Sequence, residues 1–200
     1  VRFAHGTAGG WDEFGPIRKI TKSVGSVLYE LDGKPALDLY ETYLGEEAAE
    51  LPAAGLLYPL KIWNSDAAGD QVVRTILSID REARSMTFAG DMPEGTNARL
   101  MRGSFENLVD GAAQAAIHAR NVMGQDAADP QLCLLVSCVG RRLLMGQRTA
   151  DEVEAVGEAL GTNTSLAGFY SYGEIAPHNE SGICSLHNQT VTITLIAEAA

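Results

Sequence analysis

Apolar and polar positions alternate in the last part of the chain. In VTITLI, the odd-numbered positions Val191, Ile193 and Leu195 are apolar, so this segment is predicted to form a strand with one buried face. The same face continues backwards through Gln189 and His187. The side of the strand that faces the core therefore becomes polar at its start.

A second polar edge is predicted just upstream, in GFYSYGEIAP. On an extended strand, Tyr170, Tyr172 and Glu174 fall on one side. Beside the polar start of the C-terminal strand, they would form a rim of phenols, a carboxylate, an imidazole and an amide, as in a ligand pocket. A structural interpretation fits equally well, with the tyrosines packing across strands and His187 as a half-buried, hydrogen-bonded histidine. The pattern leaves both interpretations open.

Two segments have the 3.6-residue periodicity of amphipathic helices. The first is predicted over 104–123, with Ser104 as its N-cap. The second is predicted over 149–160, where Thr149 and Glu152 have the spacing of a capping box. Both helices are expected to pack against a sheet.

The strand pattern indicates the fold class. LCLLVSC is almost continuously apolar, as in a strand buried on both faces, and is predicted to lie near the middle of the sheet. Four strand-like segments follow one another within 56–103, and their short polar spacers favour an antiparallel meander, because parallel neighbours need long crossovers. We therefore expect an α+β fold, with a mixed, mainly antiparallel sheet and two main helices packed against it.

Composition narrows the possible partners. A formal net charge of −11 argues against nucleic acid or an anionic membrane as partner, because either would be repelled. The longest apolar runs are too short to cross a bilayer. Cys133, Cys138 and Cys184 are an odd number without the spacing of metal ligands, which favours a reduced cytoplasmic protein without a metal site.

A second group of candidate site residues ends the central strand, in SCVGRR. Arg141 and Arg142 could together hold a carboxylate or phosphate, or they could pair with the protein's own carboxylates. Cys138 is by default a small buried apolar residue. As a nucleophile it would need His187 as its base, which makes a cysteine-dependent enzyme an alternative function.

Three ordered motifs carry a family resemblance. SCVGRRLLMG, GFYSYGEIAP and LHNQTVTITLI resemble the C-terminal domain of FIST proteins. The upstream segment GWDEFGPIRKITKSVGSVLYELDGKPALDLYETYLG resembles the end of the FIST N-terminal domain and its junction with the C-terminal one. By this resemblance, residues 1–33 are the tail of an N-terminal FIST-type domain and residues 34–200 a C-terminal FIST-type domain, and most of the N-terminal domain is missing.

The resemblance implies a non-catalytic, cytoplasmic sensory domain of a bacterial signal-transduction system. Such a domain binds a small molecule, here an amino acid or a related metabolite, and signals to a histidine kinase, a chemotaxis receptor or a cyclic-di-GMP enzyme. Some members bind haem and sense nitric oxide. Haem would be held here by His187, because His178 lies in a predicted exposed loop. No nucleic acid or membrane partner is expected, and a homodimer is compatible with this function.

The polar groups of these segments can be assembled into one candidate ligand site. In it, Arg141 or Arg142 would hold a ligand carboxylate, Glu174 would bind an amine, and the tyrosines would form apolar walls. A docking or dimerisation module is a further alternative, and its sign would be a large exposed apolar patch. The predicted ligand-binding residues are Cys138, Arg141, Arg142, Tyr170, Tyr172, Glu174, His187, Asn188 and Gln189.

Overall fold

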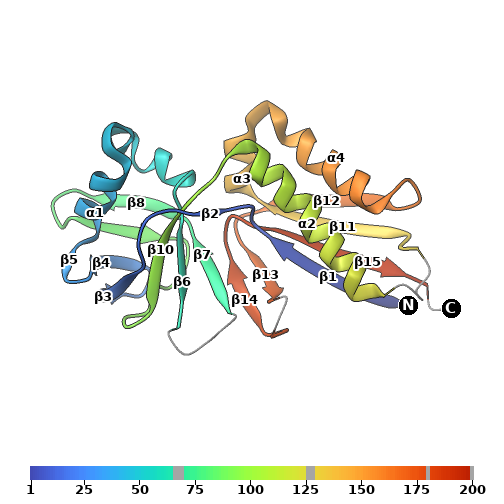
Figure 1. The fold of residues 1–200 in the computed structure, drawn as a ribbon, viewed down its shortest axis with the longest axis horizontal. Coiled ribbons are helices and arrows are strands. Elements are labelled where there is room, and N and C mark those ends of the chain that lie inside the picture. The colour runs from blue at the N-terminus through green and yellow to red at the C-terminus, as the bar shows by residue number, and fades with distance from the viewer. Residues whose placement is uncertain (65–69, 125–128, 179–180, 199–200) are drawn as a thin grey trace. The chain divides into compact units, whose positions relative to one another are not determined.

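The computed structural model describes residues 1–64, 70–124, 129–178 and 181–198. The chain forms two compact units (Figure 1). Unit 1 consists of Val1–Trp11 with Gly103–Ala200, and unit 2 of Asp12–Arg102. These units divide the chain at other places than after residue 33, and the assignment of FIST-type domains to 1–33 and 34–200 stays a prediction.

Unit 1 is built on a four-stranded sheet. Its strands are β1 (Arg2–Ala8), β11 (Leu132–Cys138), β12 (Ser165–Ser171) and β15 (Val191–Ala197), and its helices are α2 (Phe105–Met123), α3 (Val139–Met145), the 3-10 helix η3 (Gly146–Arg148) and α4 (Thr149–Leu160). The spatial order of the strands is β1-β15-β11-β12. Only β11 and β12 are parallel in this order, and α3, η3 and α4 lie in the crossover that a parallel pair requires.

One face of this sheet carries the core of unit 1. There Val191, Ile193 and Leu195 are fully buried, which confirms the alternation predicted for the C-terminal strand. Helix α2 packs on β1 and β15 and against α4. The approach is close, because a Cβ atom on Gly6 would lie 2.1 Å from the carbonyl oxygen of Ala115. Small residues on helix and strand therefore allow backbone contact.

Strand β11 lies inside the sheet, as predicted, but it is not buried on both faces. Cys133 and Leu135 are buried, whereas Leu132 and Leu134 on the other face are 36% and 37% exposed. An apolar run predicts burial without saying which side is covered. Here the buried residues alternate with exposed ones, so the core lies on one side only.

The strand predicted to run through Tyr170, Tyr172 and Glu174 is interrupted. Strand β12 ends at Ser171, and a short hairpin of β13 (Glu174–Pro177) and β14 (Cys184–His187) follows as a separate two-stranded sheet. The break removes the shared face. Tyr172 is 90% exposed and Glu174 is buried.

Both predicted helices are present, but only the first has the N-terminal cap that the sequence predicted. The Ser104 Oγ atom accepts the backbone N–H of Asn107 at 3.1 Å, which confirms it as the N-cap of α2. The capping box predicted for α4 is wrong, because Thr149 is the first helical residue and no side chain caps it. Glu152 turns into the core instead.

Unit 2 is mainly antiparallel sheet. Its strands are β2 (Asp12–Glu13), β3 (Arg18–Val24), β4 (Val27–Leu31), β5 (Lys34–Pro35), β6 (Leu60–Trp63), β7 (Gln71–Arg74), β8 (Ile76–Asp80), β9 (Ser85–Phe88) and β10 (Asn97–Arg102), and its helices are α1 (Ala36–Leu44), η1 (Gly45–Glu50) and η2 (Ala53–Leu56). The main strand order is β7-β6-β10-β3-β4-β9-β8. The antiparallel pairing is as predicted, but the order is not a simple meander.

The sheet of unit 2 curls around its core. The strands at the two ends of the order, β7 and β8, are separated in the chain by Thr75 alone. The ends of the sheet must therefore approach each other. Leu28, Met86 and Phe88 are buried in the enclosed core, together with Tyr40 and Leu37 of α1.

The two units together give the predicted fold class. Sheets are mixed and mainly antiparallel, and helices pack against them, as in an α+β protein. None of the helices in the described residues has the length and hydrophobicity of a membrane span.

Candidate functional site

A buried arginine follows the central strand. The Arg141 side chain is fully buried at the start of α3, and its Nε atom lies 2.7 Å from Oε1 of Glu152 in an ion pair. Its other two nitrogens donate to the carbonyl oxygens of Gly9, at 2.6 Å, and Leu108, at 2.7 Å. Ser137 Oγ lies 3.0 Å from Glu152 Oε2. The Arg141 guanidinium is therefore bound within unit 1, and not to a ligand carboxylate.

The neighbouring Arg142 has a different environment. It is exposed, and its guanidinium lies 5.2 Å from the centre of the Tyr170 ring. The structure thus separates the two arginines that the sequence predicted to act as a pair. Arg142 remains available to a ligand, whereas Arg141 is part of the core.

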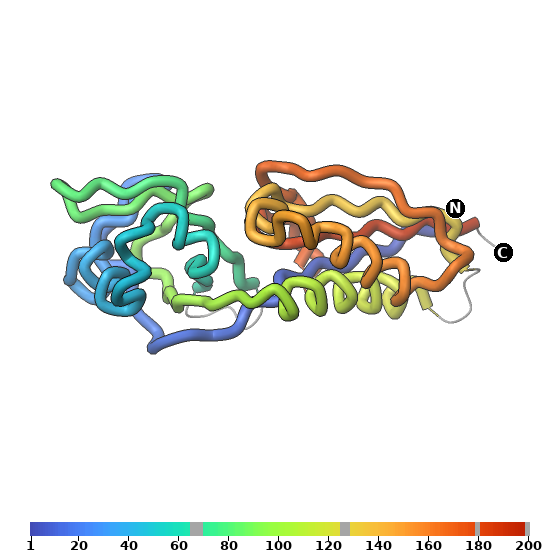
Figure 2. The backbone as a smooth tube through the Cα atoms, turned by 90° about the horizontal axis from the view of Figure 1, so that it is seen from above, coloured from blue at the N-terminus to red at the C-terminus, as the bar shows by residue number. Residues whose placement is uncertain are grey.

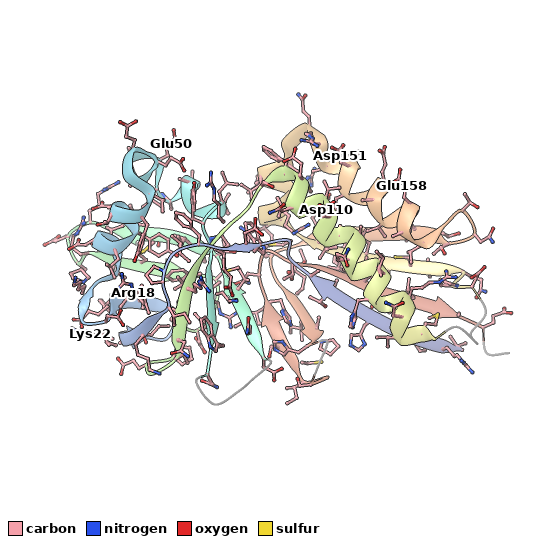
Figure 3. The ribbon with its side chains drawn as sticks, viewed as in Figure 1. Arg18, Lys22, Glu50, Asp110, Asp151 and Glu158 are labelled. Atoms are coloured by element: carbon pink, nitrogen blue, oxygen red, sulfur yellow. The ribbon has the colours of Figure 1, made fainter. Side chains whose placement is uncertain are left out.

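Three acidic side chains on helices α2 and α4 point outward. Figure 3 shows Asp110 on α2 and Asp151 and Glu158 on α4 projecting from unit 1. Glu152 lies between them in sequence but is fully buried against Arg141. These three carboxylates point into solvent, whereas a buried carboxylate such as that of Glu152 needs a specific partner.

Glu174 is a second buried carboxylate, and its partners are neutral. The side chain is 3% exposed, and it accepts hydrogen bonds from Ser171 Oγ at 2.7 Å and Thr190 Oγ1 at 2.9 Å. No ion pair of Glu174 is formed within the residues that the structure describes. Burial raises the pKa of Glu174, while the two hydroxyl groups, the charge of Arg141 and the backbone N–H of Thr190 oppose this shift.

His187 lies directly across the hairpin from Glu174. The two residues are partners in the β13–β14 register, so their side chains share one face. Both are buried, as the predicted rim requires. The His187 Nε2 atom lies 3.0 Å from the carbonyl oxygen of Ala176, and its ring centre is 4.8 Å from that of His178.

The histidine environment does not fit an axial haem ligand. Nε2 of His187 lies 3.0 Å from the carbonyl oxygen of Ala176, so binding of a haem iron by this nitrogen would break that contact. His178 is 7% exposed and its ring packs on His187, so its predicted exposure is wrong, although Ser181 and Gly182 of the same segment are exposed. In the part of the chain described, no cluster of His, Cys, Asp and Glu is arranged to hold a metal ion.

The turn between β14 and β15 adds amide groups to this region. Gln189 has a φ of 56°, so the chain does not continue as one alternating strand from His187 to Val191. The Gln189 side chain packs against Gly140, where a Cβ atom would lie 2.9 Å from its Oε1. Asn188 Nδ2 donates to the His187 carbonyl oxygen, and its Oδ1 atom is buried without a partner among the described residues.

Cys138 is at the junction of β11 and α3 and is buried. Burial and the nearby charge of Glu174 raise the pKa of its thiol, against the opposing effect of backbone N–H groups of Gln189, Gly140 and Arg141. A thiol with a raised pKa is protonated at neutral pH and is a poor nucleophile. This environment gives no support to the cysteine-dependent enzyme.

The structure assembles part of the predicted site and adds residues to it. Cys138, Glu174, His187, Asn188 and Gln189 surround the start of the hairpin and its return to β15, whereas Tyr172 is at the surface. Three further members were not predicted: Ser171, Thr190 and His178. On one uninterrupted strand Ser171 would lie on the face opposite Glu174, and the break after β12 brings the two together.

Comparison with known families gives two matches. The FIST C domain model matches residues 36–177, and the FIST N domain model matches residues 1–34. The first match includes Cys138, Arg141 and Glu174 and ends before His187. No curated protein and no solved structure matches the chain.

The two adjacent arginines provide a matched test of the buried ion pair. Arg141→Met leaves Glu152 buried without a cation, so we expect a loss of about 3–5 kcal/mol in the free energy of unfolding. Arg142→Met changes an exposed side chain and is expected to cost no more than about 0.5 kcal/mol. Urea denaturation measures both values. Equal losses in the two variants would contradict the structural role of Arg141.

The three cysteines test the state of Cys138 within one sample. Cys133 and Cys138 are buried and Cys184 is exposed, so iodoacetamide at neutral pH should alkylate Cys184 first and Cys138 much more slowly. Peptide mass spectrometry gives the three rates, and denatured protein serves as the control in which all react. Faster alkylation of Cys138 than of Cys184 would identify a reactive thiolate and revive the enzyme hypothesis.

Proposed function

Because the chain belongs to the FIST family, whose domains are sensory domains of signal transduction, we propose that it senses a small molecule carrying an amine. The proposed ligand is an amino acid or a related metabolite, and its binding region is the hairpin start around Glu174. The proposed role is non-catalytic.

The environment of Glu174 is the observation that carries this proposal. A buried carboxylate is costly unless it is paired, and here its hydrogen-bond donors are two hydroxyl groups and the backbone N–H of Thr190, all of them uncharged. An ammonium group would supply a charge-assisted hydrogen bond that the described residues do not. Burial raises the pKa of Glu174, and a cation in contact with the carboxylate would oppose that shift.

Two further groups suit a ligand with several polar atoms. Asn188 Oδ1 is a buried acceptor without a hydrogen-bond partner in the described residues, and such groups are rare in folded proteins. Arg142 is exposed and is the remaining candidate for a ligand carboxylate, since Arg141 is bound to Glu152. An amino acid offers both an amine and a carboxylate.

The setting proposed for this sensor is the bacterial cytoplasm. Three free cysteines are compatible with a reducing compartment. The partners that the family resemblance implies are a histidine kinase of a two-component system, a chemotaxis receptor or a cyclic-di-GMP enzyme. Ligand binding between the hairpin and β15 would change the packing of Glu174, and this change is the signal proposed to reach the partner.

Isothermal titration calorimetry with a panel of amino acids and amines tests the proposal. Glu174→Gln keeps the size of the side chain but removes its charge, and its NH2 group would donate to one of the two hydroxyl groups that now donate to the carboxylate. We expect it to weaken binding of an amine ligand by about tenfold or more, which corresponds to about 1.4 kcal/mol. Glu158→Gln, on the exposed surface of α4, is the matched control and should bind as the wild type does.

The pH dependence of binding separates a charge effect from a change of shape. Since the pKa of Glu174 is raised, its carboxyl group becomes protonated at a higher pH than an exposed glutamate does. The affinity of the wild type should therefore fall as the pH is lowered through that pKa, and the Glu174→Gln variant should lack this fall. No binding by any member of the panel, or binding indifferent to Glu174→Gln, would refute the proposal.

A further inference from the structure

Strand β12 forms an open edge of the sheet in unit 1. Figure 2 shows it outermost, beside β11, β15 and β1 in that order. The backbone N–H of Ser165 donates to the Gln131 carbonyl oxygen on the β11 side, and main-chain groups alternate in direction along a strand. The main-chain groups of Leu166, Gly168 and Tyr170 therefore point outward, where no partner strand lies within the described residues.

This edge lacks the features that usually prevent strands from pairing. Edge strands are commonly protected by charged side chains, proline or a bulge. The sequence of β12, SLAGFYS, has neither charge nor proline, and its register with β11 is unbroken over Ser165–Ser171. In an acidic chain with a net charge of −11, an uncharged edge of this length is a distinct surface.

Apolar side chains flank the edge on both faces of the sheet. Phe169 is 60% exposed on the face away from the helices, next to Ala167 in the alternation of the strand. A mainly apolar groove of about 280 Å³ runs along this edge, and it is lined by Leu135, Val153, Leu166, Ala167, Gly168, Phe169 and Tyr170. A partner at this edge would therefore gain main-chain hydrogen bonds and apolar contacts together.

We propose that β12 pairs with β12 of a second copy of the chain, in antiparallel orientation about a twofold axis at Gly168. In this register Gly168 faces its own counterpart, and Leu166 faces Tyr170 of the other copy. These are the residues whose main-chain groups point outward, so each pair exchanges hydrogen bonds. The result is one continuous sheet across the dimer.

The side chains of β12 are complementary to themselves in this register. Ala167 of each copy lies opposite Phe169 of the other, so a small residue meets a large one on the open face. Gly168 places no side chain at the axis, where a Cβ atom would lie 1.8 Å from the carbonyl oxygen of Leu135 on the neighbouring strand β11. A twofold interface requires this kind of self-complementarity, which favours a second copy over an unrelated peptide.

The net charge of the chain leads to a second expectation, which concerns the effect of salt on the dimer. Two copies that each carry a net charge of −11 repel one another, whereas the proposed contact itself is uncharged. Added salt screens the repulsion, so dimerisation should become stronger with increasing ionic strength. An interface formed by ion pairs would show the opposite dependence.

Sedimentation equilibrium with the full chain and a charge-exchange series tests the register. The wild type should form a dimer, and Phe169→Glu and Ala167→Lys should each weaken it about tenfold or more, because each places a charge opposite an apolar residue. In the double variant, the introduced carboxylate and ammonium face each other across the axis in both directions. We expect the double variant to recover much of the dimer.

The controls separate this interface from other contacts and from loss of fold. Phe3→Glu replaces an aromatic residue that is 68% exposed at the other edge of the sheet, on β1, and should leave the dimer unchanged. Circular dichroism verifies the fold of each variant. Without any substitution, the amide protons of Leu166, Gly168 and Tyr170 should exchange more slowly with solvent as the protein concentration rises.

Several results would overturn the proposal. One is a wild-type protein that stays monomeric at high micromolar concentration. A monomer that binds an extended peptide along β12 would also overturn the proposal. A dimer indifferent to both single variants would place the interface elsewhere. Failure of the double variant to recover, with its fold intact, would exclude the register centred on Gly168.

Discussion

The structure of unit 1 depends on the buried guanidinium of Arg141. A charge without access to water is tolerated only when it is paired and its hydrogen-bonding groups are satisfied. Here Glu152 supplies the counter-charge, and the carbonyl oxygens of Gly9 and Leu108 accept the remaining donors. The loop after β1, helix α2, helix α4 and the turn from β11 into α3 are thereby held around one side chain.

The same arrangement determines what is left for function. Because Arg141 is in contact with Glu152, the other buried carboxylate, Glu174, has Ser171 and Thr190 as its donors. The two glutamates differ in role for this reason: one is neutralised by a structural cation, and the other has a pKa raised by burial. A ligand amine is the complement that the second glutamate is proposed to bind.

Local sequence patterns predicted the helices and strands well, but they predicted the contacts between these elements less well. The alternation in VTITLI and the N-cap Ser104 depend on neighbours in sequence, and both are confirmed. The capping box failed because Glu152 pairs with Arg141, a contact between helices that no local spacing reveals. β11 was predicted to be buried on both faces, because an apolar run does not indicate that helices cover one side only.

The residues of the candidate site were also predicted only in part. Glu174 and His187 were predicted on one rim and are cross-strand partners. Tyr172 was misplaced because the strand stops at Ser171, and the break could not be read from an extended run of strand-forming residues. His178 was missed because a polar, glycine-containing segment predicts an exposed loop, whereas ring packing on His187 buries it.

Unit 1 contains two separate regions with proposed roles: the hairpin start around Glu174 and the outer edge of β12. The buried polar groups around Glu174 lie where β13 follows β12, and the outer edge of β12 is uncharged and available to another strand. Family membership establishes a sensory domain, and the electrostatics of Glu174 are the basis for the ligand chemistry proposed here.

The most direct test of this account is an NMR titration of the Glu174 carboxyl carbon, assigned by its loss in Glu174→Gln. In the free protein the account predicts a titration midpoint above the ordinary pKa of a glutamate, and saturation with an amine ligand should lower that midpoint, because a bound cation favours the carboxylate. An ordinary midpoint in the free protein, unmoved by any amine or amino acid, would contradict the central claim.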